Sequence, residues 1–431
     1  MTNRFWTLVA VVFGLFLVGM ASLKGAVILL ALPLLAYLAW SARSAPWGAK
    51  LEAQRTLNTH VVKADQPLQV RLEITSAGAE IAECFVEDDL PEEALCAGGS
   101  PRGLRSLGEG ESFELAYTLQ SSRGRYNLEG LQARLGDHFG LLQQVIRFSA
   151  VDELRTAPRV PNLRSVRIRP SHTRGFSGPI PARLSGSGMI FWGVREFHLG
   201  DTLRQVNWKV SSRHTDALYT NEFEMERIAD VGLILDARAQ VDITVRDERL
   251  FEYSVSALAA LAGAFLADGH RVSMLSYGYG IQRVYPGYGR VQRARILQAL
   301  AEVEPGSNYA LENFNHLPTR LFPARSQLVM VSPLHPRDYS TYVRLRRDGY
   351  EVMLVSPNPV EFEVRLYPAS PMLEQARRMA QLERDLWLRR LVRLGVQVVD
   401  WQVDQPIEKV IHSMLDRQPL VRRNTQMMVK P

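Results

Sequence analysis

The side chains most able to do chemistry gather in one segment, residues 195–213, which reads REFHLGDTLRQVNWKVSSR. Charged residues alternate there with large apolar ones, so ion pairs and stacking contacts can form side by side. Arginine offers a planar fork of donors to carboxylates and also stacks on rings. We therefore predict a buried ion-pair and stacking network. Its candidate members are Arg195, Asp201, Arg204 and Arg213, interleaved with Phe197, Val206 and Trp208.

A catalytic interpretation of this segment stays open as the alternative. His198 could serve as a base near Asp201, and Ser185 or Ser187 could be the nucleophile of a hydrolase. The sequence fixes none of the hydrogen-bond geometry that such chemistry requires, and function has to be argued from a site. We favour the structural network.

Other phosphate and metal motifs are missing from the sequence. Residues 158–193 are rich in Gly, Ser, Pro and Arg, yet no Lys and Ser or Thr follow a glycine as a P-loop requires. The nine histidines form no HExxH motif, and Cys84 and Cys96 form no CxxC pair. We expect an ordered loop at 158–193, two free thiols in a reducing compartment, and no cofactor.

Composition and charge narrow the class of protein. With 46% hydrophobic and 22% charged residues, the chain is not disordered, and 431 residues predict two or three domains beside any membrane segment. The net charge of +6 suits an anionic membrane surface and nucleic acid equally. Because the N-terminus is also apolar, we expect the partners of this chain to be a lipid bilayer and other proteins, and we expect no nucleic acid.

The first 45 residues predict a transmembrane helical hairpin. Two apolar runs, about 5–23 and 25–40, flank Lys24, and each is near the minimum length for a span. A cleaved signal peptide has a much shorter apolar core. Arg4 and Arg43 flank the pair of spans, so the positive-inside bias predicts a cell-membrane protein with both termini and the soluble region in the cytoplasm.

Residues 46–155 predict an Ig-like β-sandwich. Residues 68–74 and 113–119 alternate apolar with polar side chains, as half-buried strands do, and further strands are expected at 81–86 and 128–135. Turn residues separate them. The motif DHFGL at 137–141 is interpreted as turn chemistry.

Residues 226–416 predict a doubly wound α/β domain, preceded at 156–225 by the glycine-rich loop and the polar segment. Apolar runs predict buried parallel strands, and helical spacing predicts the connections. The residues from 417 to 431 are expected to be a mobile basic tail. The expected strands are 231–235, 272–277, 327–331, 351–355 and 396–399, and the expected helices are 250–267, 291–301, 339–347, 371–394 and 407–415.

The helix expected at 371–394 is rich in arginine. We predict that Leu373, Leu386 and Leu394 pack on the sheet while the arginines face solvent. Contact of these arginines with anionic lipid is the alternative.

The polar segment resembles the signature of the domain-of-unknown-function family 58, R-x-Y-x-x-G-D-D-x-R-x-I-D-W followed by A-R. Six residues fit this signature, and five depart from it. The family layout implies a membrane hairpin, a β-sandwich, the signature and a von Willebrand factor A-like domain, together with MoxR-type AAA+ ATPase partners and an undefined activity. The fitting residues are Arg195, Gly200, Asp201, Arg204, Trp208 and Arg213, and the departures are Phe197, Thr202, Val206, Asn207 and Ser212.

The resemblance also implies a divalent cation site, D-x-S-x-S, after the first strand of the α/β domain. Here Asp236 is present, but Arg238 and Gln240 stand where hydroxyls belong. The later threonine position falls near residues 307–308, and the strand expected to end in Ser-Asp ends in Ser332 and Pro333. A cation beside Arg238 would meet like charge, so we predict a degenerate, metal-free site.

These features together predict a membrane-anchored cytosolic protein-interaction or assembly module that works with a MoxR-like AAA+ ATPase. The alternative is a hydrolase that uses His198 and Asp201.

Overall fold

The structure is a computed structural model of the 431-residue chain. It describes residues 2–417 except positions 65, 79, 92, 150, 165, 167, 169–179, 214 and 215. Side chains at 180–190, 192, 223–227, 310, 316 and 415–417 also lie outside the description. Residues 165, 167 and 169–179 of the predicted glycine-rich loop and nearly all of the predicted tail fall outside these residues. The chain divides into two compact units, Met1–Ala157 and Pro158–Pro431.

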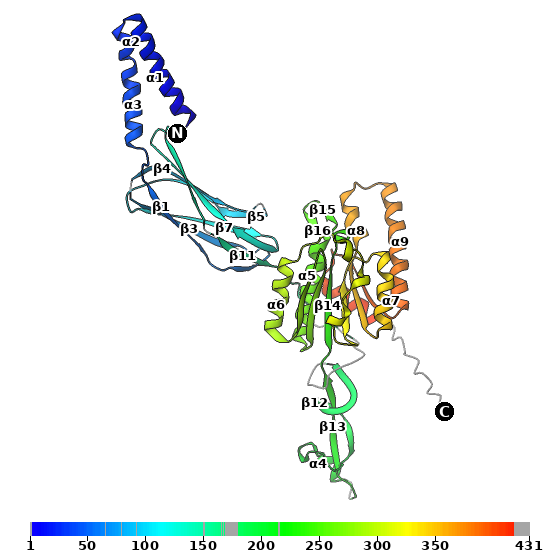
Figure 1. Ribbon diagram of the computed structural model, residues 1–431. Coiled ribbons are helices and arrows are strands. Elements are labelled where there is room, and N and C mark those ends of the chain that lie inside the picture. The colour runs from blue at the N-terminus through cyan, green and yellow to red at the C-terminus, as the bar shows by residue number, and fades with distance from the viewer. Residues whose placement is uncertain are drawn as a thin grey trace. The chain divides into compact units, whose positions relative to one another are not determined.

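The first unit begins with a pair of apolar helices that lie side by side (Figure 1). α1 (Asn3–Ser22) is followed by α2 (Gly25–Leu29) and α3 (Ala31–Arg43), and the stretch Gly25–Arg43 forms one candidate span. Leu23 adopts φ 52° in the turn between the spans. Both spans are long and apolar enough to cross a membrane and expose most of their side chains. The predicted apolar helices are thus confirmed, and they suggest membrane anchoring.

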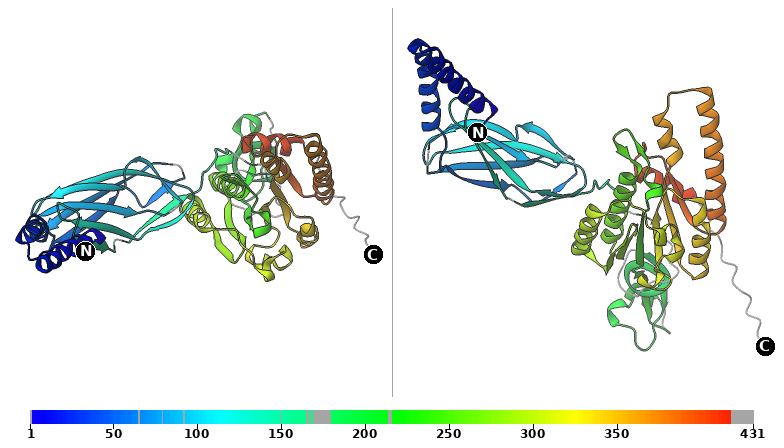
Figure 2. Two further views of the ribbon diagram at one scale, coloured as in Figure 1. Left: turned by 90° about the horizontal axis from the view of Figure 1, so that it is seen from above. Right: turned by 45° about the horizontal axis from the view of Figure 1, so that its top comes forward.

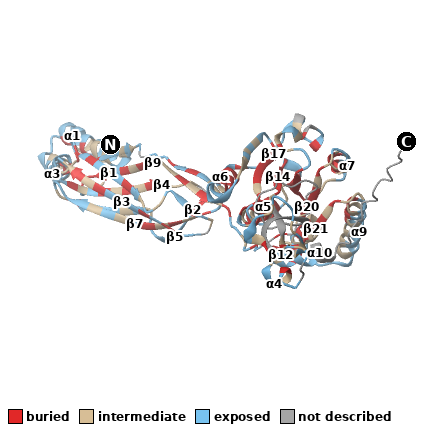
Figure 3. Cartoon of the chain, turned by 90° about the horizontal axis from the view of Figure 1, so that it is seen from below, coloured by how far each residue is buried: buried red, intermediate tan, exposed pale blue. Residues whose placement is uncertain are grey.

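The rest of the first unit is β-rich, as predicted. Strand β3 alternates buried side chains with exposed or half-buried ones along its whole length (Figure 3). Residues of both main sheets meet in the interior, for example Leu72 and Ile74 of one sheet with Val86 and Leu131 of the other. The predicted strand at 128–135 is interrupted at Glu129. The sheets are β1 (Lys50–Leu57), β3 (Leu68–Ala77), β7 (Ser112–Ser121) and β5 (Ala94–Gly99); β10 (Gln143–Phe148), β9 (Gly130–Gly136), β4 (Ile81–Asp89) and β6 (Arg102–Leu107); and β2 (Val61–Lys63), β11 (Asp152–Ala157) and β8 (Gly124–Leu128).

A six-stranded sheet forms the centre of the second unit, in the order β18-β17-β14-β19-β20-β21. All neighbours are parallel except the edge strand β18, which is antiparallel to β17. The strand at its centre, β14, is buried along its whole length. Such strands are fully apolar because helices cover both faces. The strands are β14 (Asp230–Ala237), β17 (Arg271–Gly278), β18 (Ile281–Gly287), β19 (Gln327–Val331), β20 (Glu351–Pro357) and β21 (Gln397–Trp401).

Helices pack on both faces of this sheet, as the burial clusters and the two views of Figure 2 show. On one face lie α5 (Leu250–Ala267), α6 (Gly289–Glu302) and α10 (Ile407–Arg417). On the other lie α7 (Tyr339–Arg347) and α9 (Pro371–Arg393). α5 is apolar enough to be a membrane span by composition, but it is 72% buried within the unit. It is therefore a core helix.

Smaller elements connect these. They are the short helix α8 (Pro359–Glu363), the strand pair β15 (Thr244–Val245) and β16 (Glu248–Arg249), and the 3-10 turns Leu203–Gln205, Ala239–Val241, Tyr309–Leu311, Phe314–His316, Thr319–Leu321, Pro336–Asp338 and Val364–Leu366.

An antiparallel ribbon of β12 (Ile180–Glu196) and β13 (Tyr219–Arg227) precedes the sheet, with the short helix α4 (Trp208–Ser211) in its connection (Figure 1). The prediction of a loop up to residue 193 was therefore wrong from Ile180 onwards. Glycines disfavour a strand in sequence-based reasoning, and here they accompany irregular pairing. The register shifts between Gly186 and Phe191 and again before Gly193.

The face of α9 that packs on the sheet also differs from the prediction. Arg384, Leu388 and Leu391 are its buried residues, whereas Leu386 is 58% exposed. Positions 384, 388 and 391 share one face of a helix, and position 386 lies nearly opposite position 384. Arg384 is buried because it donates hydrogen bonds to Asp400 and to the carbonyl oxygen of Pro333.

Candidate functional site

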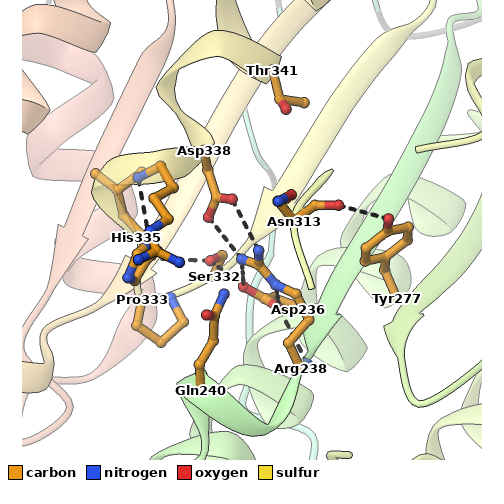
Figure 4. Close-up of polar contacts among 12 residues, drawn as sticks. Asp236, Arg238, Gln240, Tyr277, Asn313, Ser332, Pro333, His335, Asp338 and Thr341 are labelled. Atoms are coloured by element: carbon orange, nitrogen blue, oxygen red, sulfur yellow. Dashed lines mark hydrogen bonds and ion pairs between the residues drawn. The ribbon is translucent and has the colours of Figure 1, made fainter. Parts of the chain in front are cut away.

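The carboxyl end of β14 carries an arginine held between two aspartates (Figure 4). Asp236 lies in the buried strand, and Arg238 follows the strand directly. The third member, Asp338, lies at the start of α7. The side chains of all three are at most 3% exposed. We call Asp236, Arg238 and Asp338 the buried triad.

Every N–H of the Arg238 guanidinium has an acceptor. Nε and one Nη2 hydrogen bond reach the two oxygens of Asp236 at 2.8 and 2.7 Å. Nη1 and Nη2 reach the two oxygens of Asp338 at 2.9 and 2.7 Å, and Nη1 also donates to the carbonyl oxygen of Glu312 at 3.1 Å. A guanidinium has five N–H donors, so this side chain has none left for a ligand. The ring of Phe314 lies 3.9 Å from its Cζ.

Other groups complete the shell of Asp236. The Ser332 hydroxyl, just after β19, donates to its Oδ2 at 2.6 Å, and the backbone N–H of Arg238 donates to its Oδ1 at 3.3 Å. Ser332 is the residue that the sequence pattern predicts at the end of this strand. Two carboxylates around one guanidinium leave one negative charge in excess, which these neutral donors stabilise.

Asp338 was missed by the sequence analysis. It is 100 residues from Arg238 along the chain and precedes a helix, where an aspartate is typical of a helix cap. Its side chain makes no capping bond to α7 and turns toward the guanidinium instead. The only sequence signal for Asp338 was that the cation motif lacks its second acidic residue near Asp236, so a carboxylate from elsewhere in the chain could fill that role.

The buried charges shift nearby pKa values. Burial opposes the charged form of Arg238, but hydrogen bonds and charge from Asp236 and Asp338 outweigh it and raise the pKa of Arg238 above its usual value. Burial, and then the charges of Asp338 and Asp236, raise the pKa of Tyr342 well above 10.0. Both side chains therefore keep one protonation state at any physiological pH.

The residues of this site do not fit a divalent cation. The ligand positions of Asp236 and Asp338 are taken by Arg238, and a metal ion there would meet a positive charge at contact distance. Among the described residues, no three His, Cys, Asp or Glu side chains gather as a metal site would need. The guanidinium occupies the place that a cation would take between the two carboxylates.

A cavity of about 300 Å³ lies beside the triad. Gln240 lines it and donates to the carbonyl oxygen of Glu312 at 3.3 Å. Ser307 and Asn308, the residues expected near the missing threonine position, line it as well, and Tyr309 stands fully exposed at its rim. The predicted site residues Asp236, Arg238 and Gln240 thus meet at one end of the sheet, but only the two charged ones bond to each other.

A second arginine–carboxylate group lies in the ribbon. Arg195 of β12 bonds both oxygens of Asp201 at 2.7 and 2.8 Å and reaches Glu222 of β13 at 2.9 Å. Gly200, with φ 114°, makes the turn that returns Asp201 to Arg195, a conformation that favours glycine. Hydrogen bonds from Arg195 and then from the backbone N–H of His198 lower the pKa of Asp201 to about 2. We call this group the ribbon pair.

The predicted buried network does not extend beyond this pair. Trp208 is 64% exposed, and Arg204 and Arg213 are exposed, with side chains that make no hydrogen bond or ion pair within the described contacts. Arg195 itself is 37% exposed. Of the predicted members, Val206 is buried, at 5% exposed. The prediction of burial was wrong for Arg195, Arg204, Trp208 and Arg213, because a two-stranded ribbon has no second layer to cover their side chains.

The alternative catalytic residues are not assembled into a triad. Both oxygens of Asp201 are engaged by Arg195, and its contact with His198 is to the backbone N–H, at 2.8 Å. His198 is exposed, and its imidazole makes no hydrogen bond among the described contacts. Ser185 and Ser187 lie in β12 at positions whose side chains are outside the description. A base that lacks its orienting partner is a poor general base.

Three similar structures are the CARDB domain of a protein from Pyrococcus furiosus (13% identity, 25% of this chain and 88% of that one, TM-score 0.17), a FixG-related protein from Vibrio parahaemolyticus (10%, 25% and 95%, TM-score 0.17) and the cupredoxin domain of amoB from Nitrosocaldus yellowstonii (9%, 25% and 86%, TM-score 0.19). Such TM-scores carry no argument about fold or function.

No curated protein matches the chain. One family model does match, and it covers residues 193–363, which include the ribbon pair and the buried triad. Its description is "Protein of unknown function DUF58". The chain therefore carries a DUF58 family domain at residues 193–363, joined to a region with two N-terminal apolar helices.

Proposed function

We propose that the chain is a membrane-anchored protein-interaction or assembly module whose DUF58 domain engages a protein partner. The observation that carries this proposal is the pair of arginine groups. The buried triad is saturated by its own bonds, and the ribbon exposes large side chains that no described residue covers. The first is suited to holding a fold, and the second to contacting another molecule.

The two apolar helices support the anchor. The soluble parts would lie on the cytoplasmic side of the cell membrane, because Arg4 and Arg43 flank the helices at the end away from the Lys24 turn. Neither span has an Asp, Glu, Lys, Arg or His residue between its ends, so a transport pathway is not part of the proposal.

We further propose that the six-stranded domain is von Willebrand factor A-like. In chain order its strands run 3-2-1-4-5-6 with the third antiparallel at the edge, which supports this proposal. The resemblance implies a divalent cation at the end of the first strand in proteins of this class, whereas Arg238 takes that place here. Partner binding by this chain should therefore be independent of divalent cations.

The proposed contact surface is the turn of the ribbon. Leu199, Leu203 and Trp208 are 106%, 68% and 64% exposed, and they alternate with the exposed cations Arg204 and Arg213. Tryptophan and arginine are enriched among the residues that dominate binding energy at protein interfaces. The exposed cations favour a partner with an acidic surface.

We propose a MoxR-like AAA+ ATPase as that partner, since it is the partner class that the family resemblance implies. A hydrolase at His198 and Asp201 gains no support from the geometry, because the carboxylate is committed to Arg195.

A binding measurement with matched variants tests the proposal. The full chain in nanodiscs is titrated with a purified MoxR-like ATPase, with EDTA and with magnesium. The test variant is Leu203→Ser with Trp208→Ser. The control is Leu382→Ser with Leu386→Ser on α9, whose side chains are 66% and 58% exposed and so are equally tolerant of change.

We expect the ribbon variant to bind more than tenfold more weakly, as loss of a binding hot spot does, while the α9 control and EDTA change nothing. If both variants bind the ATPase with equal affinity, the ribbon is not part of the interface. Absence of binding by the unmodified chain would overturn the partner assignment.

A further inference from the structure

The loop between β9 and β10, residues 137–142, holds the ends of both apolar helices. Asp137 is fully buried there. Its Oδ2 accepts a hydrogen bond from the Ser41 hydroxyl of α3 at 2.6 Å, and its Oδ1 accepts from the backbone N–H of Leu142 at 2.8 Å. The DHFGL motif therefore does more than form a turn. It places a carboxylate where the last turn of α3 can bond to it.

The start of α1 joins the same loop. Thr2, the cap residue of α1, donates through both its backbone N–H and its hydroxyl to the carbonyl oxygen of Leu141, at 3.1 and 2.8 Å. The rings of Tyr37 and Phe139 are in contact, with centroids 4.4 Å apart and planes tilted by 47°. The two helix ends and the loop thus form one bonded joint.

The exposed side chains of this joint are basic and aromatic. Arg4 and Arg43 lie in the first and last turns of the helix pair, are exposed, and make no ion pair among the described residues. Trp40 and Trp47 are each 66% exposed, and the Trp47 indole donates to the carbonyl oxygen of Ala42. Asp137, the carboxylate that holds the joint, is turned inward.

We infer that this joint is a docking surface for the headgroups of anionic phospholipids, with loop 137–142 in the interfacial layer of the bilayer. The inference rests on the proposed membrane anchor. If the helices cross the bilayer, their ends lie at its surface, and a loop bonded to both ends lies there too. Tryptophan and tyrosine prefer that layer, and basic residues beside it attract anionic lipid.

The geometry supplies an internal control for this surface, the thiol of Cys96. Cys96 is exposed and pairs with Leu119 of β7, which pairs with Leu68 at the start of β3. The joint lies at the other end of β3, where Ala77 pairs with Lys50, the first residue of β1. Nine residues of strand separate these ends by about 30 Å.

Fluorescence quenching in vesicles tests the inference. The full chain is reconstituted in phosphatidylcholine, with or without phosphatidylglycerol, and a polarity-sensitive dye is attached at one thiol. The dye is placed at His138→Cys in a Cys96→Ser background, or on native Cys96, since Cys84 is buried and protected from labelling. A nitroxide carried on the lipid headgroup is the quencher.

We expect several-fold stronger quenching at position 138 than at Cys96, and a further increase with phosphatidylglycerol that Arg4→Gln with Arg43→Gln abolishes. Ser41→Ala with Asp137→Asn should reduce quenching at position 138 to the Cys96 level while the chain still floats with the vesicles. Near-ultraviolet circular dichroism of this variant verifies that the β-rich region remains folded.

The outcomes separate this inference from the proposed anchor. A chain that does not float with vesicles overturns the anchor and the inference together. A chain that floats but is quenched equally at both positions overturns the inference alone. Quenching that is the same with and without phosphatidylglycerol overturns the assignment of an anionic headgroup.

Discussion

The buried triad and the ribbon pair use the same chemical groups in opposite surroundings. Around Arg238 the side chains are at most 3% exposed, and two aspartates come from elements far apart in the chain. Around Arg195 the exposure reaches 37%, and Asp201 lies only six residues away. In both, an arginine bonds both oxygens of an aspartate at 2.7 to 2.9 Å.

Burial decides what the same bonds are worth. Two carboxylates removed from water depend on their guanidinium, because an unpaired buried charge is very unfavourable. An exposed pair exchanges its partners for water at little change in free energy. The triad therefore holds the end of β14 to the start of α7, while the ribbon pair mainly sets the shape of a turn.

The largest expected effect comes from Arg238→Met. It leaves Asp236 and Asp338 buried without a cation, and we expect a loss of about 3–5 kcal/mol in the free energy of unfolding. Hydrogen exchange of the β14 amides in the full chain measures it. Adding Asp236→Asn and Asp338→Asn should recover much of the loss. A loss smaller than about 1 kcal/mol for the single variant would mean that water reaches these carboxylates.

The second largest expected effect is the pH dependence of stability that comes from a buried histidine. Burial lowers the pKa of His270 from 6.5 to about 4, and the side chain is 2% exposed. Below pH 6.5 the unfolded chain binds a proton that the folded chain does not, so stability is complete above pH 6.5 and falls as the pH drops toward 4. The loss is about 3 kcal/mol at most. Denaturant unfolding against pH should show it, and His270→Phe should remove that part of the slope; an unchanged slope would assign it elsewhere.

Arg195→Met should have a much smaller effect on stability. We expect the same hydrogen-exchange measurement to show no change at β14, and only faster exchange near Asp201, because the pair is open to solvent. Arg204→Met, an exposed arginine without described bonds, is the control. A loss at β14 as large as that of Arg238→Met would erase the distinction between the two sites.

The smallest expected effect concerns the titration of the Asp201 carboxylate. The pKa of Asp201 is about 2 instead of 3.8, so the contribution of its ion pair is present above pH 3.8 and is lost as the pH falls through 2. Carboxyl NMR of the full chain in nanodiscs should place the midpoint near 2, and Arg195→Met should return it toward 3.8. A midpoint that stays the same in Arg195→Met would mean that the hydrogen bond from the His198 backbone N–H lowers the pKa of Asp201.

Local pattern was sufficient for the elements themselves. The apolar runs around Lys24 have one stable arrangement as helices, and the alternation at 68–74 and the apolar run at 231–235 lie within β3 and β14. Period and hydrophobicity act over a few residues, so one sequence reports them. The same reasoning failed for β12, where glycines and register shifts disguise a strand, and for Leu386, whose helix face was misassigned.

The sequence by itself determined which residues could act as charges, where the apolar helices lie, and that Arg238 stands two residues after Asp236. Tertiary structure alone decided what became of them. It places Asp338, 100 residues away in the chain, within hydrogen-bond distance of Arg238. It leaves Trp208 exposed on a two-stranded ribbon, and it lets the Ser41 hydroxyl donate a hydrogen bond to Asp137. The physical reason is that burial and long-range bonding depend on which elements pack together, and spacing along the chain does not contain that information.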